Sequence, residues 1–193
     1  MNAALFQSIR QWILQPKFEK ERALVLFFIK LLAIWLSWKG IFWLLGEEKV
    51  PIQERVIPAV SVIWESFNLW LVEILLQISQ SVLEGLGYAS KVTERSIWIE
   101  DVHAVGVGNY CLGLQLMYYN TLLVLISQAS AKRKIIGIGF GIVITNVFNV
   151  IRITGLALIA LHYPTWIEVA HDHIFNIMVF GTMIGFYMRY IAK

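Results

Sequence analysis

The residues of this chain that could do chemistry are one thiol, one guanidinium and a pair of imidazoles. Cys111 is the only cysteine in 193 residues, Arg152 lies inside an apolar segment, and His171 and His173 open the last apolar segment. A thiol with an imidazole is the minimum apparatus for a nucleophilic thiolate and its acid/base partner. A nearby guanidinium can stabilise the thiolate or the oxyanion of an acyl transfer. These residue types together predict cysteine-dependent acyl transfer.

Arg152 is the clearest single candidate, because an ionisable residue at membrane depth is costly and marks function by default. Asn149 and Asn146 precede it by three and six residues, so the three side chains share one helical face. The alternative is an arginine that snorkels to the outer headgroups. The two asparagines favour a polar site that faces into the helix bundle.

Cys111 is predicted to start a helix, where the dipole and the unpaired N–H groups favour the thiolate. Taken alone, a single cysteine in a membrane helix is most often a small apolar residue. His171 and His173 fall on different helical faces, so we expect only one of them to face Cys111. One cysteine and two histidines are weak evidence for a metal site. No G-x-S-x-G, H-E-x-x-H, P-loop or dinucleotide motif is present, and we expect no metal and no cofactor.

The composition determines where this chemistry takes place. Hydrophobic residues make up 58% of the chain and charged residues 15%, whereas about 25% are charged in a typical soluble domain. A soluble fold of this size could not bury so much apolar surface, and the same composition excludes disorder and a disulfide scaffold. A net charge of +3 suits basic residues that flank membrane spans better than nucleic-acid binding. The chain is therefore predicted to be an all-α integral membrane protein, a multipass bundle that binds lipid and no nucleic acid.

Four segments are long and apolar enough to cross a bilayer, which takes about 20 residues. They run over residues 23–45, 111–130, 135–163 and 174–191. A fifth segment, residues 57–83, carries a polar stripe on one helical face. It is either an interfacial or partly inserted helix, or a span whose stripe faces the bundle.

Basic clusters give the predicted topology. They precede the first span, follow the second at Lys132–Lys134, and close the chain at Arg189 and Lys193. The positive-inside rule places all of them in the cytoplasm. Residues 46–110 then begin and end outside, which favours the interfacial or partly inserted helix at 57–83. The same count places Cys111 at the outer boundary.

The domain organisation follows from these segments. Residues 1–193 are predicted to form one membrane domain, with a cytoplasmic segment at 1–22 that shows no cleavable signal peptide. Residues 57–110 form an extracytoplasmic helix and a short β-hairpin, which the β-branched and aromatic residues between Gly85 and Gly108 indicate. Residues 111–193 form a catalytic core of three spans.

The order of these motifs resembles the exosortase/archaeosortase family. Cys-x-Gly opens a span at Cys111, Asn-x-x-Arg-Ile from Asn149 to Ile153 lies near the end of the next span, and a histidine followed by an aromatic begins the last. The resemblance covers roughly residues 57–193. It implies a multipass membrane cysteine transpeptidase with Cys111 as nucleophile, Arg152 as stabilising cation and His171 as acid/base, with His173 as the alternative base.

The resemblance departs from the family pattern in two ways. The chain has about four spans where longer members have about eight, so it looks like a compact bacterial branch. Phe175 and Asn176 stand where many members carry a glycine, which leaves the choice between His171 and His173 open.

The resemblance also implies the substrate and the location. The substrate would be a secreted protein with a C-terminal sorting signal, made of a short motif, a transmembrane helix and a basic tail. The enzyme would lie in the bacterial inner membrane, with its active site on the extracytoplasmic side.

The alternative class of function is non-enzymatic. Arg152 with Asn146 and Asn149 would suit an anion or lipid-headgroup site in a small transporter or an assembly subunit. Such a protein would not need Cys111. A membrane thiol oxidoreductase would ordinarily need a second cysteine, and the chain has none.

Overall fold

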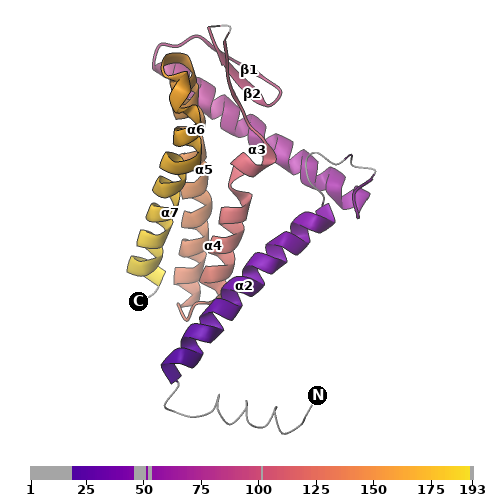
Figure 1. The fold of residues 1–193 in the computed structure, drawn as a ribbon, viewed down its shortest axis with the longest axis vertical. Coiled ribbons are helices and arrows are strands. Elements are labelled where there is room, and N and C mark those ends of the chain that lie inside the picture. The colour runs from indigo at the N-terminus through magenta and orange to yellow at the C-terminus, as the bar shows by residue number, and fades with distance from the viewer. Residues whose placement is uncertain (1–18, 46–50, 52–53, 101, 192–193) are drawn as a thin grey trace. The chain divides into compact units, whose positions relative to one another are not determined.

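A computed structural model describes residues 19–45, 51, 54–100 and 102–191, in which helices predominate and one small sheet is present (Figure 1). The predicted all-α membrane fold is confirmed, since four helices are long and apolar enough to cross a membrane. The predicted cytoplasmic segment 1–22 lies almost wholly outside the described residues. The chain divides into two compact units, residues 1–41 and residues 42–193, which are described separately.

The first unit holds most of helix α2 (Glu19–Leu45), whose apolar window from Phe28 to Leu45 matches the predicted span 23–45. The second unit contains all the residues proposed for chemistry. Its helices are α3 (Pro58–Gly85), η3 (Asn109–Leu112), α4 (Leu114–Ile126), α5 (Ala131–His162), η4 (Pro164–Trp166), α6 (Ile167–Val169), η5 (Ala170–Ile174), α7 (Phe175–Phe186) and η6 (Tyr187–Ile191). Its strands are β1 (Ser90–Thr93), β2 (Ser96–Ile99) and β3 (Val102–Gly106).

Helix α3 is one long, regular helix over nearly the same residues as segment 57–83, which was expected to be interfacial or partly inserted. It begins at Pro58, a residue whose fixed φ and missing N–H suit the first turn of a helix. By length and composition it is one of the four helices that could cross a membrane. Its polar stripe is mostly exposed, with Glu73 and Gln77 hydrogen-bonded to each other.

The second predicted span differs from the structure. The sequence predicts a helix from Cys111 to about Ser130, whereas α4 covers only Leu114–Ile126. Gly113, two residues after the cysteine, adopts a left-handed φ of 68°, which ends the 3-10 turn η3 and lets α4 begin at Leu114. Lys132–Lys134 lie in the first turn of α5 and not in a loop, because α5 begins at Ala131.

The predicted hairpin is present and carries a third strand. The order is β1-β2-β3, and both neighbouring pairs are antiparallel. Burial alternates along β2, where Ile97 and Ile99 are fully buried. One face of this sheet therefore covers the protein core.

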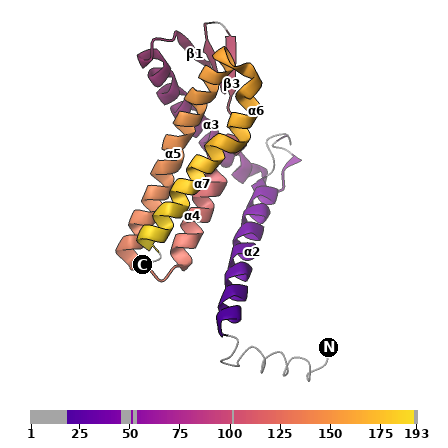
Figure 2. The ribbon, with the colours of Figure 1, turned by 60° about the vertical axis from the view of Figure 1, so that its left-hand side comes forward.

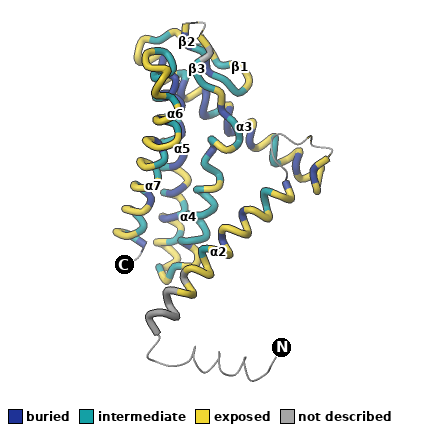
Figure 3. Tube along the Cα trace, viewed as in Figure 1, coloured by how far each residue is buried: buried dark blue, intermediate teal, exposed yellow. Residues whose placement is uncertain are grey.

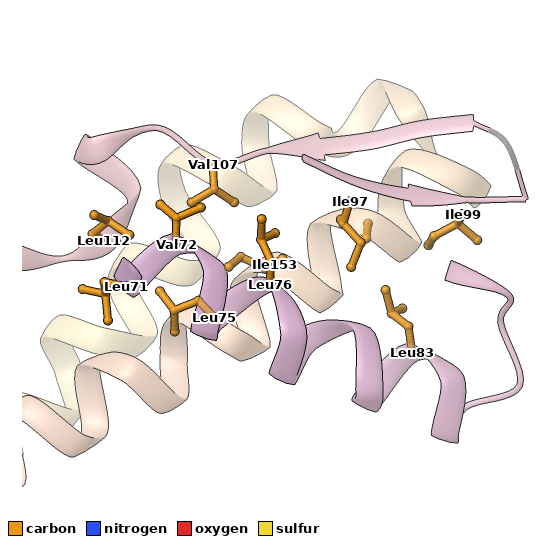
Figure 4. Packing of buried hydrophobic residues seen from close by; sticks show 11 residues of the cluster. Leu71, Val72, Leu75, Leu76, Leu83, Ile97, Ile99, Val107, Leu112 and Ile153 are labelled. Carbon is orange, nitrogen blue, oxygen red and sulfur yellow. The ribbon is translucent and has the colours of Figure 1, made fainter. Parts of the chain in front are cut away.

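The core of this unit lies between α3, the sheet and α5 (Figure 4). Leu83 of α3 points toward Ile97 and Ile99 of the sheet, and Leu76 lies beside Ile153 of α5. Cys111 is partly buried against this cluster. The same packing that stabilises the sheet thus positions the turn that carries the thiol.

Helices α4 and α7 both pack along α5 (Figure 2). Much of α7 is exposed (Figure 3), and its exposed residues include the apolar Ile177, Phe180 and Ile184, whereas most residues of α4 are only partly exposed. Ile135 of α5 and Ile177 of α7 expose 72% and 71% of their surface. Such side chains are expected to face lipid.

Candidate active site

The nucleophile candidate lies in a short turn that is held on both sides. Cys111 is the third residue of η3, and its backbone N–H donates to the Gly108 carbonyl at 2.9 Å. On the C-terminal side, buried Asn149 of α5 donates from Nδ2 to the Leu112 carbonyl at 2.8 Å. Asn149 thereby ties the residue after the cysteine to the helix that carries Arg152.

On the N-terminal side, Asn109 belongs to a closed ring of hydrogen bonds that we call the Glu65 brace, made of Glu65, Arg95 and Asn109. Arg95 donates to Glu65 Oε1 at 2.5 Å and to Asn109 Oδ1 at 2.8 Å. Asn109 Nδ2 donates to Glu65 Oε2 at 3.2 Å. The brace connects α3, the segment between β1 and β2, and the turn of Cys111.

The structure brings His171 to the cysteine. His171 lies in the π-helical turn η5, and its Nε2 is 4.0 Å from Cys111 Sγ. The imidazole is half-buried, with 40% of its side chain exposed. This separation is within the range of a loose apo contact that tightens when substrate binds.

Arg152 reaches the same imidazole nitrogen from α5. Its Nη2 lies 2.6 Å from His171 Nε2 and donates to the His171 carbonyl at 3.4 Å. Arg152 Nε is buried and has no hydrogen-bond partner within the described part of the chain. The thiol, imidazole and guanidinium therefore meet at a single nitrogen, and the buried Nε of the guanidinium is not used in this contact.

Asp172 is a residue of this site that the sequence reasoning missed. Its Oδ1 lies 2.7 Å from His171 Nδ1, on the side of the ring opposite Arg152. Neighbouring residues on a regular helix do not face each other, so the sequence provided no reason to expect a contact between His171 and Asp172. The only signal was the position of Asp172 between the two histidines.

The other candidates lie elsewhere. His173 is exposed and forms no hydrogen bond in the described ranges. Asn146 donates to the Ile142 carbonyl of its own helix at 2.8 Å. Among the described residues, it forms no hydrogen bond with Cys111, Arg152 or His171. Over the residues that the structure describes, no group of three or more His, Cys, Asp or Glu side chains is arranged to hold a metal ion.

The fold and the site define a helical membrane protein in which a thiol, an imidazole and a guanidinium converge. The model of the transmembrane exosortase family (Exosortase_EpsH) matches residues 3–189, nearly the whole chain. The chain belongs to this family. Neither the curated proteins nor the solved structures contain a match to it.

Proposed function

We propose that the chain is a membrane cysteine protease/transpeptidase that cleaves the C-terminal sorting signal of secreted, membrane-tailed proteins through a thioester on Cys111. The observation that carries the proposal is the convergence of Cys111 Sγ and Arg152 Nη2 on His171 Nε2, at 4.0 and 2.6 Å. A transporter or assembly subunit would need the cation but would have no use for a thiol at the same imidazole. Membership of the exosortase family supports the enzymatic choice.

The first half of the proposed reaction forms the acyl-enzyme. His171 Nε2 takes the thiol proton as Sγ attacks the carbonyl carbon of the scissile peptide, and the oxygen becomes an oxyanion. Arg152 turns its donors, including the free Nε, to that oxygen. The C–N bond then breaks, the leaving amine takes the proton from Nε2, and a thioester remains on Cys111.

The second half releases the product. An amine or water attacks the thioester carbon and gives its proton to His171 Nε2. The S–C bond breaks, and the new amide or acid leaves. The thiolate recovers the proton from Nε2, which returns the site to its starting state.

The contacts of His171 Nε2 in the absence of substrate suggest how substrate binding activates the thiol. Nε2 has one lone pair, and Arg152 occupies it at 2.6 Å while the thiol stands at 4.0 Å. At rest Arg152 and the thiol compete for this lone pair, and the base becomes fully available to the thiol when Arg152 donates to a substrate oxygen instead. Substrate binding and activation of the nucleophile are thereby coupled.

An apolar cavity beside the turn of Cys111 supports a membrane-embedded substrate. It measures about 600 Å³ and lies between α3, α4 and α5, and Leu114, three residues beyond the cysteine, is among the residues that line it. Trp70 and Ile74 line one side, and Val147 and Ile151 line another. One face of the substrate's transmembrane helix would fill this space while its scissile bond reaches Cys111 at the extracytoplasmic surface of the inner membrane.

The test is co-expression with a panel of secreted reporters that end in membrane-tailed sorting regions from the same genome. Cleavage is followed as loss of the tail by mass spectrometry, and the thioester as a covalent adduct that hydroxylamine releases. We expect both signals to vanish in Cys111→Ala. Processing that continues in Cys111→Ala would refute the proposal and favour the transporter or assembly alternative.

A further inference from the structure

The hydrogen bonds around His171 determine which ring nitrogen carries the proton. An arginine has donors and no acceptor, so Nε2 accepts from Arg152 across the 2.6 Å contact. The neutral imidazole then carries its hydrogen on Nδ1, which donates to Asp172 Oδ1 at 2.7 Å. This tautomer leaves Nε2, the nitrogen nearer the thiol, as the base.

Asp172 also contributes to the charges that surround the imidazole of His171. Arg152 from α5 places a permanent cation beside the ring. Cys111 from η3 faces the same nitrogen, and His173 lies two residues away on the same turn. Asp172 places a carboxylate at Nδ1, on the side of the ring opposite this cation.

The local backbone explains how neighbouring residues form this pair. His171 and Asp172 both belong to the π-helical turn η5, between α6 and α7. A π-turn widens the helix and redirects its side chains, and such turns recur at functional sites. The turn holds one ring nitrogen toward Asp172 and the other toward Cys111 and Arg152.

We propose that Asp172 is a positioning residue of the active site, which holds His171 in the Nδ1–H tautomer and offsets the charge of Arg152 so that Nε2 can take the proton of Cys111. The inference rests on the proposed function and adds an orienting carboxylate to the cysteine–histidine–arginine set. Asp172 acts through His171 and touches no reacting atom.

The test measures the reactivity of Cys111 without a substrate. Because Cys111 is the only cysteine, iodoacetamide labelling of the full chain in nanodiscs reports on it alone by intact mass. In Asp172→Ala, we expect the pH midpoint of alkylation to move up by about one unit, because the thiolate loses its stabilised imidazolium partner. Asp172→Asn keeps an acceptor without the charge and should shift the midpoint less, and Asp172→Glu should restore part of it. The control is Glu168→Gln, an exposed carboxylate one turn earlier, which should leave the midpoint unchanged.

Cleavage of a processed reporter gives the second readout. Asp172→Ala should lower kcat by about 100-fold with KM within about twofold, as for loss of an effective general base. A merely structural role would lower the yield or the melting temperature and leave both the pH midpoint and kcat of the folded enzyme at wild-type values, which would overturn the inference. If Cys111→Ala abolishes cleavage while Asp172→Ala does not reduce it, only this inference fails. If Cys111→Ala still cleaves, the proposed function itself has failed.

Discussion

At the scale of single residues, the role proposed for Arg152 depends on the shape of its guanidinium as well as on its charge. One Nη2 serves both the ring and the carbonyl of His171, and the buried Nε stays available. Lysine supplies a point charge without this planar fork. We expect Arg152→Lys to lower cleavage by about 100-fold or more, as for loss of an oxyanion donor.

The measurement is reporter cleavage at matched membrane abundance, with Arg152→Ala for comparison. An arginine that only anchors at the headgroups would tolerate lysine, because position and charge suffice there. Wild-type cleavage in Arg152→Lys would therefore remove the cation from the catalytic set.

The two histidines provide the second prediction at this scale. His171 contacts the thiol, the guanidinium and Asp172, whereas His173 is exposed. His171→Ala should lower turnover by about 100-fold to 10,000-fold, the usual contribution of a positioned acid/base. His173→Ala is the matched control and should stay within about threefold of wild type, since it removes only a nearby charge. The opposite ranking would keep the mechanism and move the base by two residues.

At the scale of elements, the turn η3 depends on the Glu65 brace for the position of Cys111. Glu65 and Arg95 are largely buried, with 18% and 23% of their side chains exposed. Glu65→Gln keeps the size and removes the charge that holds Arg95. We expect a loss of about 1–2 kcal/mol in the free energy of unfolding, and a fall in kcat of about tenfold because small displacements of a nucleophile are costly.

Glu73→Gln is the control for the Glu65 brace, because Glu73 is an exposed glutamate of the same helix α3. It should change neither stability nor kcat. The double variant of Glu65→Gln with Asn109→Ala should lose little more stability and kcat than either single variant, because each change disrupts the same Glu65 brace. Fully additive losses would show that the two residues act separately.

Gly113 is the second element-scale feature, because it separates η3 from α4. It has a φ of 68°, and an added Cβ would lie 2.5 Å from Thr145 Cγ2 of α5. Gly113→Ala combines the left-handed penalty of about 1–2 kcal/mol with this steric overlap. We expect a loss above about 2 kcal/mol in unfolding free energy, and weaker cleavage because the turn of Cys111 must shift.

Two other glycines separate the backbone penalty from the steric overlap. Thermal unfolding of the alanine variants is followed by tryptophan fluorescence. Gly87 has a φ of 91° and open space around it, so Gly87→Ala measures the backbone penalty alone. Gly139 lies inside α5 with open space and no positive φ, so Gly139→Ala should be neutral or stabilise by up to about 1 kcal/mol. Equal losses for Gly113→Ala and Gly87→Ala would remove Thr145 from the explanation.

At the scale of the whole molecule, hydrophobic periodicity predicted the helices, while packing determined the details of the site. Length and hydropathy suffice for α2 and α5, because a span needs little more than apolar residues in number. Segment 57–83 was expected to be interfacial or partly inserted, whereas α3 is long and apolar enough to cross a membrane. The end of η3 at Gly113 was not predicted, since a left-handed glycine inside an apolar run gives no periodic signal. Residue types and their order predicted that Cys111, Arg152 and either His171 or His173 would meet, and the structure brings His171 to the other two. Asp172 and the Glu65 brace depend on a π-turn and on contacts between distant segments, which spacing along the sequence does not encode.

The last prediction concerns the side of the membrane on which the site lies. Lys132–Lys134 occupy the first turn of α5, and Arg152 lies 20 residues further along the same helix. At 1.5 Å per residue the two are about 30 Å apart, the thickness of the hydrocarbon core. If the basic turn is cytoplasmic, the site must therefore be at the outer boundary.

Cys111→Ala removes the only cysteine and gives a background for single-cysteine labelling. Lys91→Cys places a thiol at an exposed position of β1, and Ser130→Cys places one at the exposed start of α5. In right-side-out membrane vesicles, an impermeant maleimide should label Lys91→Cys at once and Ser130→Cys only after detergent is added. The reverse pattern would place the sheet and the thiol in the cytoplasm, where a substrate already secreted could not reach Cys111, and the proposed processing of secreted proteins would have to be abandoned.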